Sequence, residues 1–172
     1  VQLHPPLAGG RIHSFVLDGS RTQCLYRAEQ DFGDVTELFS VPVDGSALPT
    51  LRSATRMPTT IGDVDSFLAT PDGSRVVYHA DEETGTGLYA VDPDGSSAPV
   101  ALGGTARGFQ LTPDSLRAVY VDSYFDLHSV PLDGSASPTL ITSRAFLGSL
   151  PWRISPDSSR VVHVHQADFY SA

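Results

Sequence analysis

The sequence predicts an all-β protein, a β-propeller with four four-stranded antiparallel blades in the chain. A unit of about 42 residues recurs four times, which is the length typical of a propeller blade. Short runs of β-forming residues in each copy are separated by Asp-Gly or Pro-Asp turns, and no segment holds the apolar period of a helix. A single four-stranded sheet cannot bury both of its faces alone, whereas sheets stacked around an axis cover one another.

The first half of each repeat predicts a two-stranded hairpin. An aromatic residue is followed by Asp five positions later, by Arg eight positions later and by Tyr or His eleven positions later. This spacing holds in residues 67–78, 109–120 and 152–163. The first copy keeps the outer spacing, from Phe15 to Tyr26, with its Asp-Gly turn displaced by two residues. Because Asp-Gly adopts positive φ at low steric cost, it reverses the chain between the two strands.

The second half of each repeat predicts two further strands. An apolar run leads into Asp-Gly-Ser, and a short apolar element beginning with Pro follows it. The blades are therefore expected at residues 12–52, 64–103, 106–142 and 150–172, within a single propeller region spanning 1–172. The last copy ends before its outer strand. Residues 1–3 resemble residues 100–102, an outer strand, so they are predicted to complete a last blade.

The turns and strands of the second copy resemble a known family. Residues 71–78, with residues 88–89 and 94–95, resemble the WD40-like Pro-Asp repeat of TolB-type propellers. The same repeat occurs in the propeller domains of prolyl-oligopeptidase-type and tricorn-type proteases. The chain departs from it where Pro is missing in the first copy and where Ser replaces Gly in the third and fourth copies. The resemblance implies a propeller that binds proteins or peptides, from a bacterium, in the periplasm or secreted.

Composition excludes several classes of function. With 11 Lys plus Arg, all of them Arg, against 20 Asp plus Glu, the net charge is -9. No basic face is available for a nucleic acid, and no apolar run is long enough to insert into a membrane. One cysteine, Cys24, excludes an intramolecular disulfide.

The sequence also predicts that the chain is not an enzyme and needs no cofactor. It contains no Gly-x-Ser-x-Gly nucleophile elbow and no phosphate-binding Gly loop. His163 and His165 share one face of a strand, which would suit a metal ion. Because His163 takes the place of Tyr26 and Tyr78 in the repeat, it is interpreted as a packing residue, and no metal site is expected.

The candidate binding residues lie where the innermost strands enter the channel. They are the charged residues Arg11, Asp65, Arg107 and Arg153. The leading hypothesis is a non-enzymatic scaffold for protein or peptide ligands. The alternatives are a substrate-gating propeller domain from a prolyl-oligopeptidase-like protease, and a propeller fragment that self-assembles without activity of its own.

Four blades are few for a propeller of this family, so a partner is expected. Two copies would form a homodimer closing one eight-bladed ring, with residues 1–3 of each completing the other's last blade. A four-bladed monomer and a piece of a longer chain are the alternatives. Residues 53–63 add an insert between the first two copies, interpreted as a longer loop.

Overall fold

The computed structural model describes residues 2–7, 10–30, 35–53, 63–82, 85–143 and 152–163. These residues form fourteen strands, β1 to β14, and no helix is found among them. The strands make four antiparallel sheets that follow one another along the chain. The predicted all-β, antiparallel class is therefore confirmed for this part of the chain. None of the described elements is a helix that could span a membrane.

Each of the first three sheets contains four strands in simple sequence order. The first consists of β1 (Ile12–Leu17), β2 (Gln23–Ala28), β3 (Glu37–Pro42) and β4 (Thr50–Leu51). The second consists of β5 (Val64–Ala69), β6 (Val76–Glu82), β7 (Gly85–Val91) and β8 (Val100–Gly103). The third consists of β9 (Ala106–Leu111), β10 (Arg117–Asp122), β11 (Leu127–Pro131) and β12 (Thr139–Thr142).

The fourth sheet is smaller in the described residues. It pairs β13 (Trp152–Ile154) with β14 (Val161–His163). The third strand expected near the end of the chain, and nearly all of the 53–63 insert, lie outside the described residues. At the other end, Gln2 and Leu3 are not part of a strand. Their predicted role as an outer strand requires a second sheet beside them, so it stays a prediction.

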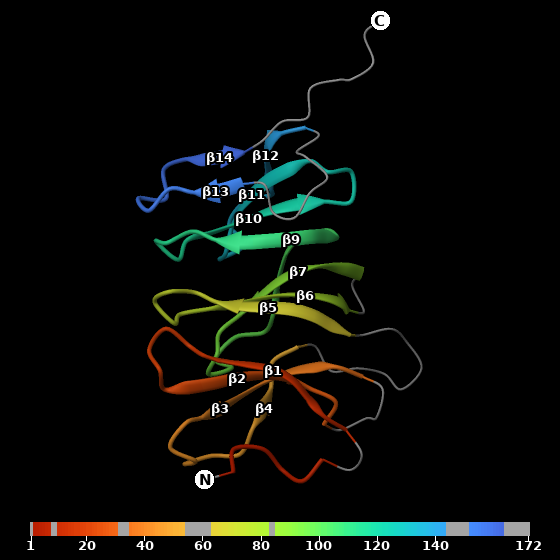
Figure 1. Ribbon diagram of the computed structural model, residues 1–172, viewed down its shortest axis with the longest axis vertical. Coiled ribbons are helices and arrows are strands. Elements are labelled where there is room, and N and C mark those ends of the chain that lie inside the picture. The colour runs from red at the N-terminus through yellow and green to blue at the C-terminus, as the bar shows by residue number, and fades with distance from the viewer. Residues whose placement is uncertain are drawn as a thin grey trace, which may run out of the picture.

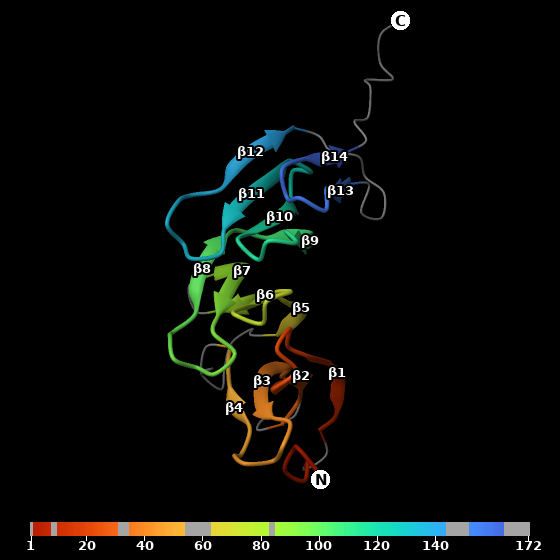
Figure 2. The same ribbon diagram turned by 90° about the vertical axis from the view of Figure 1, so that its left-hand side faces the viewer.

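The four sheets are stacked face to face along the long axis (Figure 1). The first strand of each sheet, β1, β5, β9 or β13, is an edge strand on the same side of the stack (Figure 2). The last strands, β4, β8 and β12, form the opposite side. This propeller-like order places the four first strands together, where a propeller has its channel.

The recurring aromatic residue sets the register of every first hairpin. Phe15 pairs with Tyr26, Phe67 with Tyr78, Phe109 with Tyr120, and Trp152 with His163. In the first three sheets a β-bulge interrupts this pairing near the beginning of the first strand. The extra residue of each bulge has no partner in the pairing. It interrupts the pattern in which successive side chains point to opposite faces of the sheet.

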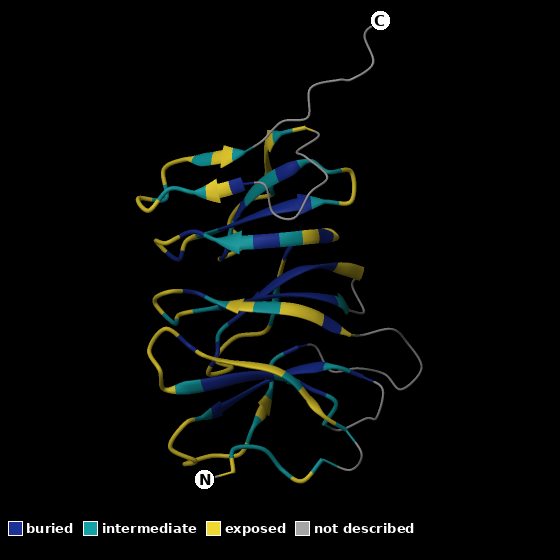
Figure 3. Ribbon diagram, viewed as in Figure 1, coloured by how far each residue is buried: buried dark blue, intermediate teal, exposed yellow. Residues whose placement is uncertain are grey.

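Apolar clusters between successive sheets hold the stack together. Leu25 and Leu38 of the first sheet pack against Tyr78 and its neighbours in the second. Val77 and Leu88 meet Phe109 between the second and third sheets. Trp152 packs on the third sheet from the fourth. Burial is greatest in the middle strands, while β1 is largely exposed (Figure 3).

Candidate functional site

A groove of about 560 Å³ lies between the first strands of the first two sheets. Its walls are β1 and β5, with the turns after each strand at one end and a charged region at the other. The volume falls within the range typical of small-ligand sites. The groove opens on the side of the stack where the four first strands gather.

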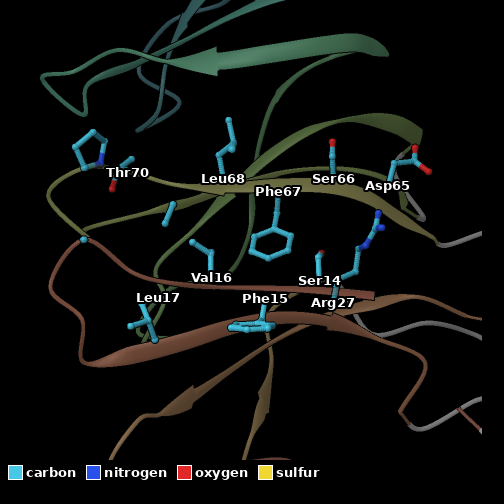
Figure 4. Close-up of a pocket in the computed structure, with 13 residues that line it drawn as sticks. Ser14, Phe15, Val16, Leu17, Arg27, Asp65, Ser66, Phe67, Leu68 and Thr70 are labelled. Atoms are coloured by element: carbon cyan, nitrogen blue, oxygen red, sulfur yellow. The ribbon is translucent and has the colours of Figure 1, made fainter. Parts of the chain in front are cut away.

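The strand alternation of β1 and β5 determines which side chains enter the groove. Ser14 and Val16 point from β1 toward β5, and Phe67 points from β5 toward β1 (Figure 4). Phe15 and Leu17 point to the other side of β1, while Ser66 and Leu68 point away from the first sheet (Figure 4). The groove therefore has an apolar middle built by Val16 and Phe67.

The backbone of both strands adds hydrogen-bonding capacity. β1 pairs only with β2, and β5 only with β6, among the described strands. The free edge of such a strand presents N–H and C=O groups that another extended segment can pair with. Apolar side chains flanked by two strand edges suit an extended peptide.

Charged side chains gather at one end of the groove. Arg27 extends from β2 toward β5, and Asp65 lies at the same end (Figure 4). Arg27 Nη1 donates a hydrogen bond of 2.9 Å to the carbonyl oxygen of Val64. Asp65 Oδ2 lies 2.9 Å from Nδ1 of the buried His79, which fixes the carboxylate while leaving it largely exposed. A ligand at this end would meet one charge of each sign.

The turns of the first two sheets close the opposite end. Gly19 lies against Pro71, and a Cβ at Gly19 would overlap the Pro71 carbonyl oxygen. Gly73 lies against Ser20 in the same way, with φ of 74°. The absence of side chains at the two glycines thus allows the sheets to approach closely here and sets the length of the groove.

Three of the predicted channel residues lie at one rim of the stack, at or just before the start of the first strand of a sheet. Arg11 precedes β1, and its Nε lies 3.5 Å from Oε1 of Glu29. Asp65 borders the groove. Arg107 of β9 lies over the ring of Phe125, 4.2 Å from the centroid. Their role in binding stays a prediction.

Arg153 differs from the other three. It follows Trp152 in β13, beyond the bulge position, and its Nη1 donates 2.9 Å to the Trp152 carbonyl oxygen. Asp65 and Arg107 instead lie two residues before the aromatic of their sheets. The fourth-sheet position equivalent to them falls outside the described residues.

The sequence argument missed His13, which takes the same position in the first sheet. It lies two residues before Phe15, within the β1 bulge, and its Nε2 lies 2.9 Å from Oε1 of Glu29. A third histidine–carboxylate pair joins Nε2 of His128 to Oδ2 of Asp122 at 3.1 Å in the third sheet. The aromatic spacing could have revealed His13 directly, because His13 precedes Phe15 by two residues, as Asp65 precedes Phe67.

One group at this rim has the composition of a metal site. Ligand atoms of Asp122, Asp126 and His128 all lie within 4.8 Å of one another. Oδ1 of Asp122, however, already accepts the backbone N–H groups of Tyr124 and Asp126. The group is thus accounted for as a turn that caps β10. The pair His163 and His165, at which no metal site was expected, is not tested, because His165 lies outside the described residues.

Comparisons with known proteins agree with the fold. No family model matches the sequence, and no curated protein matches it either. A solved prolyl endopeptidase, from a study of inter-domain dynamics in catalysis and specificity, matches 88% of this chain with a TM-score of 0.59 and 14% identity. The match lies in its propeller domain and covers 25% of that protein. The fold is propeller-like. At this identity the likeness extends to the fold alone.

Proposed function

We propose that the chain is a non-catalytic binding module that holds an extended, apolar peptide segment in the groove between β1 and β5. The observation that carries the proposal is the groove itself, with its apolar middle, two strand edges and one charged end. The resemblance of the chain's repeat to that of TolB-type propellers favours the same role, although fold alone does not determine function.

The chemistry of the groove defines the expected ligand. Addition of a strand to β1 or β5 would supply main-chain hydrogen bonds, and Val16 and Phe67 would contact an aromatic or aliphatic side chain. Asp65 and Arg27 would favour a polar or charged group at one end of the peptide. A chain with net charge -9 selects against strongly acidic ligands.

A titration with labelled peptides tests this role. Short fluorescein-labelled peptides with a central Phe or Leu would be compared with peptides of the same length in which Ser replaces that residue, by fluorescence anisotropy. The apolar peptides are expected to bind, and Val16→Asp is expected to weaken them by at least about tenfold, or about 1.4 kcal/mol. Val16 is suitable because it is 39% exposed and points into the groove.

Leu140→Asp provides the matched control. Leu140 is 51% exposed on β12, in the third sheet, and is not one of the residues that line the groove. Its substitution adds the same charge at a strand position outside the groove and is expected to leave peptide affinity within about twofold, since charges added at the surface outside a contact change affinity little. Equal losses in the two variants, or equal binding of the Ser-centred peptides, would reject the groove as the binding site.

A second candidate function rests on the likeness to a prolyl endopeptidase. Here the chain would be part of the propeller that controls access of peptides to a separate hydrolase domain. The chain spans only a quarter of that protein. The test is to read the coding sequence on both sides of this segment: a Gly-x-Ser-x-Gly domain in the same reading frame would favour this candidate over an independent scaffold.

A further inference from the structure

Asp65 presents a fixed carboxylate with spare hydrogen-bonding capacity at one end of the groove. Its Oδ2 lies 2.9 Å from Nδ1 of the buried His79, while its side chain stays 64% exposed. Both ring nitrogens of an imidazolium are donors, and Nε2 of His79 is buried with no partner among the described residues. The geometry therefore fits a neutral ring that donates Nδ1–H and leaves the carboxylate its charge.

The carboxylates at this end of the groove outnumber the guanidinium beside them. Asp63 and Asp65 are both exposed and lie on either side of Val64. Arg27 reaches this place from β2, but its Nη1 donates to the Val64 carbonyl oxygen. In the described part of the chain it forms an ion pair with neither carboxylate. A ligand at this end thus meets an excess of negative charge.

The apolar middle of the groove lies a short, defined distance from Asp65. Asp65 precedes Phe67 by two positions in β5, and Val16 points toward β5 from the opposite wall (Figure 4). A peptide strand lying along β5 advances by the same length per residue, about 3.3 Å, and its side chains two positions apart point to the same side. A peptide with an apolar residue against Phe67 therefore brings a second side chain close to Asp65.

We propose that the bound peptide carries a lysine or arginine two residues from its apolar residue, and that this basic side chain binds Asp65. The inference rests on the peptide-binding role proposed above and adds the sign and the position of the ligand's charge. The long stem of either basic side chain can lie along the apolar wall while its charged end reaches the carboxylate. There it donates a charge-assisted hydrogen bond to Asp65, whose Oδ1 has no partner among the described residues.

Peptides that differ at one residue test the sign of the charge. Seven-residue peptides with a central Phe, acetylated at the N-terminus and labelled with fluorescein at the C-terminus, would carry Lys, Gln or Glu two residues before or after the Phe. In fluorescence anisotropy, Lys at one of these two positions is expected to bind at least about threefold more tightly than Gln, as for an exposed ion pair. A preference for Glu over Gln would mean that Arg27 selects the ligand, and it would overturn the proposal.

The position of the lysine tests the spacing. Lys directly beside the Phe points to the opposite side of the strand, so it is expected to bind within about twofold of the corresponding Gln peptide. An equal gain from Lys at every position would mean general attraction to a chain of net charge -9, and it would overturn the proposal. A gain from an unacetylated N-terminus, with none from Lys, would assign the carboxylate to a free α-amine and would also overturn it.

One variant and a matched control locate the contact. Asp65→Asn removes the charge and keeps a polar side chain of the same shape beside His79, so the ratio of Lys to Gln peptide affinities is expected to fall to about one. Asp133→Asn removes the same charge from an exposed turn after β11, outside the residues that line the groove, and should keep the wild-type ratio. A lysine preference that survives Asp65→Asn would reject the assignment.

The Gln peptide separates this proposal from the one on which it rests. If it binds and Val16→Asp weakens it, the groove holds the peptide. The absence of any gain from Lys would then reject the role of Asp65 alone. If neither the Gln nor the Lys peptide binds, the groove is not a peptide site and both proposals are rejected.

Discussion

The hydroxyl of Ser115 accepts a hydrogen bond of 3.1 Å from the backbone N–H of Asp72, joining the turns of the second and third sheets. Ser158 accepts from Asp114 in the same way at 3.0 Å, joining the third and fourth. Both serines have positive φ, 64° and 61°, at the position where Gly73 has 74°. Serine in place of glycine in these turns thus provides a link between neighbouring sheets.

Substitution of Ser115 by two residues separates the link from the backbone strain. Ser115→Ala removes the hydroxyl that accepts from the Asp72 N–H, and it keeps a side chain at positive φ. The free energy of unfolding is therefore expected to fall by about 1–3 kcal/mol. Ser115→Gly loses the same bond but relieves about 1 kcal/mol of left-handed strain. Guanidinium denaturation should therefore rank stability as wild type, then Gly, then Ala.

Ser137, which is exposed in the turn before β12, provides the control through Ser137→Ala. Its free energy of unfolding should change by less than about 0.5 kcal/mol. If Ser115→Ala is as mild as Ser137→Ala, the hydroxyl contributes no stabilising link.

These turns also show how far the sequence could predict the structure. The Asp-Gly and Pro-Asp spacing predicts hairpins, and the structure pairs Phe67 with Tyr78 across one of them. The same spacing treats Ser115 as a departure from the repeat. Its role depends on a partner 43 residues away in another sheet, which local turn chemistry does not encode.

The candidate site was less predictable for a similar reason. Position in the repeat placed Asp65 at the channel side, and it does border the groove. The distance to the aromatic residue, however, aligns His13 with Asp65 and Arg107, whereas the sequence argument chose Arg11, which lies four residues before Phe15. The groove itself depends on how closely two sheets approach, which involves contacts such as that of Gly19 with Pro71.

The carboxyl group of Asp72 makes the stability of the chain depend on acid pH. Burial tends to raise its pKa, but hydrogen bonds from the Ser74 N–H, the Thr70 and Ser74 hydroxyls and Ser115 outweigh burial and lower the pKa to about 2. An unfolded Asp has a pKa of about 3.9. Because the folded value is lower, the stabilisation is fully present above about pH 4 and is lost as pH falls toward 2.

Two measurements check this dependence. Carboxyl carbon NMR shifts should give Asp72 a midpoint near 2 in the wild type, and a higher one in Ser74→Ala, which lacks the 2.8 Å donor to Asp72 Oδ1. Stability measured from about pH 4 to pH 2 should fall less steeply in Asp72→Asn than in the wild type. Equal slopes, with an ordinary Asp72 midpoint, would contradict the assignment.

Ser40 links the first two sheets on the side away from the groove. Its buried hydroxyl donates to the Pro93 carbonyl oxygen at 2.7 Å and accepts from Arg52 Nε at 2.6 Å. Ser40→Ala removes the hydroxyl to which both partners are hydrogen-bonded, so the free energy of unfolding should fall by about 2 kcal/mol. Ser129 takes the same position in β11, but among the described residues its hydroxyl accepts from Arg117 Nε of its own sheet, at 2.7 Å. Chemical denaturation should show a smaller loss for Ser129→Ala.

Gly19 connects the packing of the first two sheets to the groove. A methyl group there would overlap the Pro71 carbonyl oxygen, which is backbone and moves only if the two sheets separate. Gly19→Ala is expected to lower the free energy of unfolding by about 1–3 kcal/mol through this overlap. It should also weaken binding of the apolar peptides, because the turns of Gly19 and Pro71 close one end of the groove.

Gly104→Ala is the matched substitution, since a Cβ at Gly104 would meet no atom within 4 Å. Its stability and peptide affinity should stay close to those of the wild type. Loss of affinity in Gly19→Ala with unchanged stability would mean that the groove adjusts without the sheets separating. Unchanged stability together with unchanged affinity would contradict the prediction. It would show that Gly19 and Pro71 are farther apart in solution than in the structure, and that the groove is correspondingly wider.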